Sequence, residues 1–148
     1  MTTISAKDFF TPEQKEDIRL AIMNAELDTS GEIRVHIENT FKGDVLDRAA
    51  WVFKELKMHE TEQRNGVLIY LAIKNRTFAI IGDVGINQKT GDGFWDEIKR
   101  IMLNHFREAR FTEGLVEAIE KTGEQLKKHF PYHREDVNEL DDEVSFGN

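Results

Sequence analysis

The chain has 148 residues, a length typical of one domain. Hydrophobic residues make up 39% of it and charged residues 32%, a balance that excludes wholesale disorder. The sequence has no cysteine, which excludes disulfides, thiol catalysis and cysteine-ligated zinc, so any metal must be held by oxygen or histidine ligands. A net charge of −8 argues against binding to nucleic acid, whose phosphate backbone attracts basic surfaces.

The acidity is concentrated at the C-terminus. Six acidic residues and no lysine or arginine follow Arg134, which leaves 22 acidic and 20 basic residues in the part before. We therefore divide the chain into a domain over residues 1–134 and an acidic C-terminal tail over residues 135–148. Composition alone predicts that this tail is disordered.

No segment predicts a membrane span or an export signal. The longest apolar stretch, residues 66–73, is far shorter than the roughly 20 residues that a span needs. The first ten residues lack both a basic start and an apolar signal core. The sequence therefore predicts a soluble, cytoplasmic protein without direct membrane insertion.

The first third of the chain predicts a helix, a strand and a second helix. Residues 11–14 have the order of a capped helix start with proline in the first turn, and apolar residues at helical spacing continue to about Glu26. Residues 32–40 alternate apolar and polar side chains, which is typical of a strand with one polar face. Asp44 can cap the helix that follows, whose apolar stripe extends to Leu56.

The remainder predicts a hairpin, a loop and two helices. Residues 66–73 are almost entirely apolar, as in a strand covered on both faces, and residues 77–81 resume β-type sequence after a short turn. Residues 82–93 contain four glycines and predict a long irregular loop before two C-terminal helices, the second of which ends at Pro131. This order predicts an α/β fold, a Rossmann-like three-layer α/β/α sandwich with a mixed, partly parallel sheet.

The predicted topology brings three loops together. A right-handed crossover through the second helix makes the strands at Glu32 and Gly66 parallel, and the hairpin reverses the strand at Thr77. The start of the first strand, the start of the second and the end of the third therefore meet at one end of the sheet. We call this the loop end of the sheet and expect the functional site there.

Acidic residues at the loop end predict a cation site. The expected metal ligands are Glu32, Asp83, Asp92 and Asp96. The further candidate ligand-binding residues are His59, Arg64 and Asn65. Clustered carboxylates repel one another unless a cation or a proton lies between them, and oxygen ligands favour Ca²⁺ or Mg²⁺ over Zn²⁺.

Ordinary turn chemistry is an alternative account of these residues. Aspartate and glycine are common in turns, Asp92 can simply cap the next helix, and Arg64 can be a structural counter-ion. A rival cluster, Asp44 and Asp47, lies at the opposite end of the sheet, where open α/β folds usually bind ligands. Helix capping also explains Asp44.

The histidines and a search for known motifs give little information about the chemistry of the protein. His36 lies on the polar face of a strand, and the three histidines after residue 100 lack the i, i+4 pairing of a zinc helix, so each is expected at the surface or in a hydrogen bond. His59 is the exception, because it precedes Arg64 by five residues. The absence of nucleophile-elbow, P-loop and dinucleotide motifs argues against serine hydrolase chemistry and hydride transfer.

In combination, four segments resemble the TPM domain family. They are residues 29–33, 64–69, 82–86 and 94–96, within a resemblance that covers residues 11–130. Residues 58–61 and 130–147 further resemble the small stand-alone bacterial branch of the family, with Asp141 where proline is expected. That departure concerns only the local conformation of the tail.

The resemblance implies several properties beyond the fold. It implies an acidic groove, Ca²⁺ or Mg²⁺ binding, a membrane protein of the LemA type as a partner and, from a plant member, acid phosphatase activity on phosphate monoesters. It also implies that the tail docks on the domain or on a partner through Leu140, Val144 and Phe146.

Two functional hypotheses follow. The first is a cation-binding regulatory or assembly module in which the ion orders residues 82–93. The second is a metal-assisted phosphatase in which Arg64 steadies the developing charge. We favour the first, because the sequence shows no evident catalytic base and Asp83 lacks the Asp-x-Asp pattern of aspartate-dependent phosphatases.

Overall fold

The computed structural model describes residues 6–91, 93–131 and 144–147. Its elements are, in chain order, η1 (Ala6–Asp8), α1 (Pro12–Glu26), β1 (Glu32–Glu38), α2 (Val45–Glu55), η2 (Met58–Glu60), β2 (Gly66–Ala72), β3 (Thr77–Gly82), α3 (Val84–Thr90), α4 (Phe94–Phe106), α5 (Phe111–His129) and β4 (Ser145–Phe146). In this part of the chain, no helix is long and apolar enough to cross a membrane.

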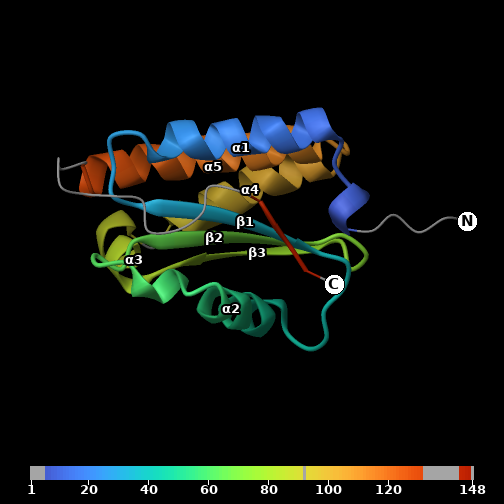
Figure 1. The fold of residues 1–148 in the computed structure, drawn as a ribbon, viewed down its shortest axis with the longest axis horizontal. Helices are drawn as coiled ribbons and strands as arrows, with labels where there is room; N and C mark the ends of the chain where they lie inside the picture. Colours follow the sequence, from blue (N-terminus) through green and yellow to red (C-terminus); the bar gives the residue numbers. More distant parts are fainter. Residues whose placement is uncertain (1–5, 92, 132–143, 148) are drawn as a thin grey trace, which may run out of the picture.

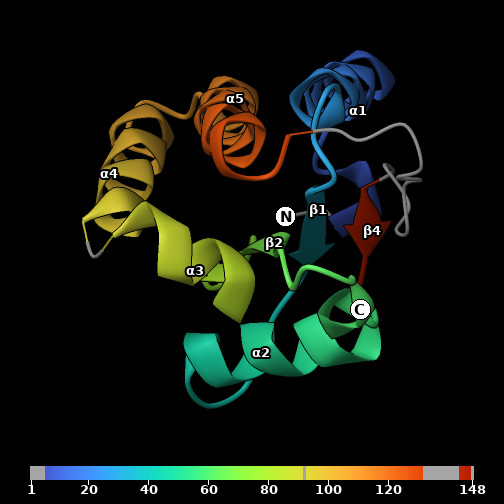
Figure 2. The ribbon, with the colours of Figure 1, turned by 90° about the vertical axis from the view of Figure 1, so that its left-hand side faces the viewer.

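The sheet has the strand order β3-β2-β1-β4. Strands β1 and β2 are parallel, with Glu32 opposite Gly66, and β3 is antiparallel to β2. Helices α1, α4 and α5 lie on one side of the sheet and α2 lies on the other (Figures 1 and 2). The predicted three-layer α/β/α sandwich with a mixed sheet is therefore confirmed.

Strand β2 is buried along its whole length. Val67, Ile69 and Leu71 belong to the core shared with α1, α4 and α5, whereas Leu68 and Tyr70 belong to the smaller core under α2. Both faces of β2 are thus covered by helices, which explains why its sequence is a continuous apolar run and does not alternate.

The prediction of an irregular loop over residues 82–93 is wrong, because seven of these residues form helix α3. The Asp83 side chain caps α3 by accepting a hydrogen bond from the Val84 backbone N–H at 2.8 Å. Gly85 lies in the first turn of α3, where a Cβ would stand 2.1 Å from the carbonyl oxygen of Gln63. Glycine is required there for close backbone contact and does not indicate a loop.

The last described residues dock on the sheet. Ser145 and Phe146 form β4 and pair in parallel with His36 and Ile37 of β1. The tail was expected to be disordered from its composition and to dock from the resemblance, and residues 144–147 dock on the domain. Leu140 and Asp141 lie outside the described residues. Strands β1 and β2 end at Glu38 and Ala72, slightly earlier than predicted.

We predict that Gly85→Ala destabilises the fold by about 1–3 kcal/mol, because its methyl group would press on backbone that cannot rotate away. The matched control is Gly93→Ala, since nothing lies within 4 Å of a Cβ at Gly93. Urea denaturation measures both free energies of unfolding. Equal values for the two variants would contradict the close packing of α3 on the segment before β2.

Candidate functional site

The structure brings the three predicted loops together at the loop end of the sheet. The backbone N–H of Gly85 donates to the Arg64 carbonyl at 2.8 Å, and that of Asp83 donates to the Gly66 carbonyl at 2.9 Å. The Asn65 side-chain amide donates to the Ser30 hydroxyl at 3.2 Å, which joins the loop before β1. The first two contacts follow from the antiparallel pairing of β2 and β3, and the third follows from the parallel pairing of β1 and β2.

Asp83 and Arg64 neutralise each other at the centre of this end. Arg64 Nε lies 2.7 Å from Asp83 Oδ2, and Arg64 Nη2 lies 2.8 Å from Asp83 Oδ1, a bidentate ion pair. The hydrogen bond with Asp83 and its charge raise the pKa of Arg64. Because Asp83 is buried and also caps α3, both of its carboxylate oxygens are engaged. Arg64 is therefore a structural counter-ion of Asp83, which is the alternative to ligand binding that the sequence left open.

The other predicted ligands that the structure describes lie in different surroundings. Glu32 is fully buried, Asp96 is exposed on the first turn of α4, and Asp92 lies outside the described residues. Near this end, Asn65 Oδ1 and His59 Nδ1 are buried and have no hydrogen-bond partner in the described part of the chain. Across residues 6–91, 93–131 and 144–147, no three His, Asp or Glu side chains are grouped to hold a metal ion.

A divalent cation therefore does not fit the described residues at this end. Ca²⁺ needs six to eight oxygen ligands and Mg²⁺ needs a near-octahedral set. A cation at Asp83 would first have to displace Arg64 from both carboxylate oxygens. The rival site is also accounted for by capping, since Asp44 accepts hydrogen bonds from the backbone N–H groups of Leu46 and Asp47.

A buried polar network at the carboxyl end of β1 was not predicted. Glu38 is 1% exposed and accepts hydrogen bonds from Arg48 and from the Tyr70 hydroxyl, the latter at 2.5 Å. His36 Nε2 lies 3.3 Å from Glu38 Oε1, and His36 Nδ1 lies 2.6 Å from the Ser145 hydroxyl. Of the two environments expected for His36, the surface or a hydrogen bond, the structure shows the second. Its partner Ser145 is 109 residues away, so local sequence could not reveal it.

The network sets the charge states of its members. Burial tends to raise the pKa of Glu38, but the hydrogen bonds from Arg48 and Tyr70 outweigh it and hold that pKa below its usual value. Burial lowers the pKa of His36 despite the neighbouring Glu38 carboxylate. Burial, followed by the hydrogen bond to Glu38, raises the pKa of Tyr70. At neutral pH the network therefore contains an ionised Glu38 and a neutral His36.

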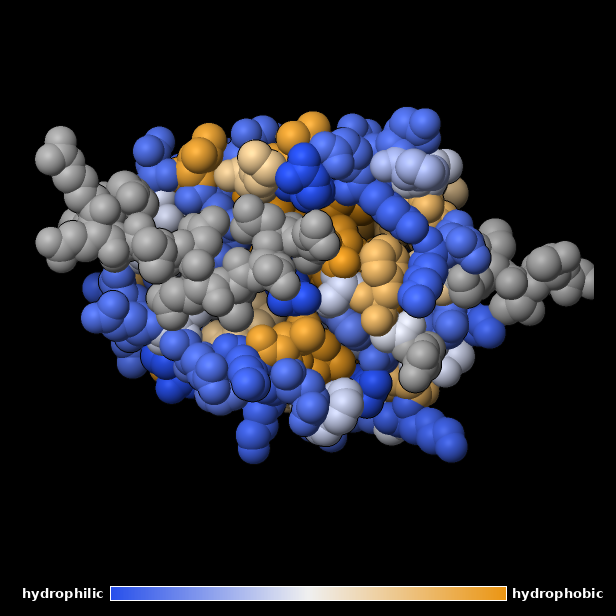
Figure 3. All heavy atoms as spheres, in the orientation of Figure 1, coloured by the Kyte–Doolittle hydropathy of each residue, from blue (hydrophilic) through white to orange (hydrophobic). Residues whose placement is uncertain are grey.

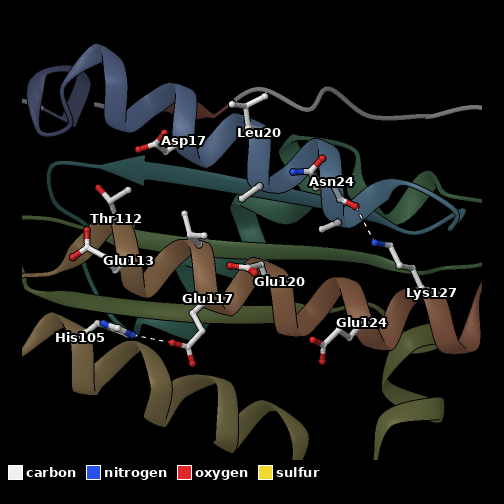
Figure 4. Close-up of a pocket in the computed structure, with 13 residues that line it drawn as sticks. Asp17, Leu20, Asn24, His105, Thr112, Glu113, Glu117, Glu120, Glu124 and Lys127 are labelled. Atoms are coloured by element: carbon white, nitrogen blue, oxygen red, sulfur yellow. Dashed lines mark hydrogen bonds and ion pairs between the residues drawn. The ribbon is translucent and has the colours of Figure 1, made fainter.

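Helices α1 and α5 and the end of α4 enclose a groove of about 800 Å³, which we call the acidic groove (Figure 4). The carboxylates that line it are Asp17, Glu113, Glu117, Glu120 and Glu124. The glutamates follow one another on α5 at a spacing of three or four residues, which places them on one face of the helix. This spacing is visible in the sequence, whereas the site predicted from the sequence lies at the loop end of the sheet.

Comparisons with known proteins identify the family. A model of the TPM domain matches residues 4–125, so the chain belongs to the TPM domain family. No curated protein is similar enough to the chain to count as a match.

Solved structures share the fold of this chain. The NMR structure of the BA42 protein from the psychrophilic bacterium Bizionia argentinensis has a TM-score of 0.90 at 46% identity, over 99% of this chain and 100% of that chain. The N-terminal domain of the cg2496 protein from Corynebacterium glutamicum has a TM-score of 0.64 at 15% identity, over 80% of this chain and 74% of that chain. The N-terminal domain of a P. gingivalis protein has a TM-score of 0.66 at 19% identity, over 84% and 83%. The last two show similarity of fold alone.

We predict that Asp83→Asn lowers the melting temperature by a few degrees, because it removes the ion pair while asparagine can still cap α3. Arg64→Gln should then lower the melting temperature less in the Asp83→Asn background than in the wild-type background. Thermal unfolding of the four proteins measures this coupling. Additive effects would show that the pair contributes nothing to the fold.

We predict that stability falls as the pH drops below 6.5, the ordinary pKa of histidine. The folded state holds His36 neutral, so the unfolded state takes up a proton first, and stability is lost until the pH passes below the folded-state pKa. In His36→Gln this part of the pH dependence disappears. Urea denaturation between pH 8 and pH 5 tests it, with the range above pH 7 as the internal control. An unchanged slope in His36→Gln would contradict the prediction.

Proposed function

We propose that this TPM domain is a non-catalytic regulatory or assembly module that acts by binding a partner. The observation that carries the proposal is the bidentate pairing of Arg64 with Asp83 at the loop end of the sheet. A carboxylate held in this way by an arginine, and also engaged in capping a helix, is unsuited to act as a nucleophile or base.

The phosphatase of the alternative hypothesis needs groups that this end does not supply. Hydrolysis of a phosphate monoester requires a nucleophile with a partner base, or a water activated by a metal ion. Arg64, which would steady the developing charge, is already bound to Asp83. The buried His36 is engaged by Ser145 and Glu38 at the carboxyl end of β1, where the strand ends away from the loop end.

This proposal does not require the cation that is expected from the sequence. The described residues at the loop end do not supply a full set of cation ligands. Ca²⁺ or Mg²⁺ would therefore compete with Arg64 for Asp83 and would bind weakly. A partner of the LemA membrane-protein type and a cytoplasmic location stay predictions.

The test measures hydrolysis of 4-nitrophenyl phosphate by the purified protein with millimolar Ca²⁺ or Mg²⁺. We expect a rate no higher than that of a mock purification. Residue-resolved NMR of the same protein during the Ca²⁺ titration should show weak, non-saturating shifts. Asp44→Asn, at the opposite end of the sheet, is the control variant for the titration.

Two results would contradict the proposal. One is steady hydrolysis that Asp83→Asn abolishes and Asp44→Asn does not. The other is saturable Ca²⁺ binding at micromolar concentration, with shifts centred on residues 82–96 that are lost in Asp83→Asn, because it would show that a cation displaces Arg64.

A further inference from the structure

We propose that the acidic groove binds a basic amphipathic helix of a partner protein. This inference rests on the proposed function, since it states the chemistry of the partner that such a module would bind. The groove is on α1, α4 and α5, apart from the loop end of the sheet and from the Glu38 network.

The carboxylates of the groove form a line with a helical repeat. Glu113, Glu117, Glu120 and Glu124 extend along about 16 Å of α5, or three helical turns. Asp17 adds a fifth carboxylate from the α1 wall (Figure 4). Lysine or arginine side chains spaced by three or four residues on a second helix would match this line.

The basic groups of the groove are already engaged. Lys127 Nζ donates to the backbone carbonyl of Asn24 at 2.9 Å, and His105 Nε2 lies 3.0 Å from Glu117 Oε1. These two contacts leave Glu113, Glu120 and Glu124 exposed to solvent. In the part of the chain that the structure describes, the groove carboxylates are not grouped closely enough to hold a metal ion. An extended cation is therefore a better match than a single ion.

The α1 wall adds apolar surface. Ala21 and Ala25 line the groove with Leu20, which is 41% exposed. Met23 and Leu27 continue an exposed apolar stripe beside it, and hydrophobic surface is visible over α1 in Figure 3. A helix with one basic and one apolar face would place the first on α5 and the second on α1.

A buried polar group lies at one end of the groove. Thr112 is 7% exposed, and its hydroxyl oxygen has no hydrogen-bond partner in the described part of the chain. Its side chain points from α5 toward α1 in Figure 4, so it offers a hydrogen-bonding group to an occupant. A second copy of this chain is a poor occupant, because each copy carries a net charge of −8.

The probe is a synthetic 18-residue helical peptide with lysines along one face and leucines along the other, and binding is followed by fluorescence anisotropy. We expect saturable binding that weakens as salt rises. Combining Glu113→Gln, Glu120→Gln and Glu124→Gln should weaken it by about tenfold or more. The matched control, Glu55→Gln with Glu60→Gln and Glu97→Gln, makes the same change in net charge at exposed sites outside the groove and should stay within about twofold.

Three outcomes would overturn the inference. They are no binding of the peptide, equal weakening by the groove and control variants, and equal binding of a peptide with the same composition in scrambled order. In each case the absence of phosphatase activity would still support a non-catalytic module. Hydrolysis lost in Asp83→Asn would refute the proposed function whatever the peptide does.

Discussion

The burial of β2 on both faces is the constraint on which the rest of this structure depends. A strand without a solvated face needs a helical layer above it and another below it, and α1, α4 and α5 on one side and α2 on the other supply them. The crossover through α2 makes β1 parallel to β2, and the antiparallel pairing of β3 with β2 brings Arg64 next to Asp83. The position of the ion pair is thus a consequence of the hairpin that the buried β2 forms with β3.

Most of the fold could be predicted from sequence because its signals are local. Each of these signals can be read from residues that are close in sequence. They are the proline and capping residues at the start of α1, the alternation in β1 and the apolar run of β2. Helix α3 could not be predicted in this way, because the reason for Gly85 is the backbone of Gln63 and Arg64, distant in sequence. Strand β4 could not be predicted from composition, because its partner is β1.

The meeting of the loops could be predicted from sequence, whereas the interactions of their side chains could not. Topology alone placed Asp83, Arg64 and Asn65 together, since strand direction decides which loops meet. Sequence could not decide whether Asp83 faces a cation or Arg64, because that choice depends on side-chain geometry over a few ångströms. The structure separates two kinds of acidic residue. Asp83 and Glu38 are buried with basic partners and stabilise the fold, whereas the glutamates of α5 lie on the surface and are accessible to a partner.

The position of β4 has a consequence for the self-association of this protein. Without β4, the β1 edge would leave backbone N–H and C=O groups unpaired, and such an edge is a template for pairing with a strand from another molecule. Gly147 closes this edge tightly, since a Cβ there would stand 2.5 Å from Glu38 Cγ. The C-terminal strand is therefore a guard against aggregation. The same strand, exchanged between two molecules, would be a route to a domain-swapped dimer.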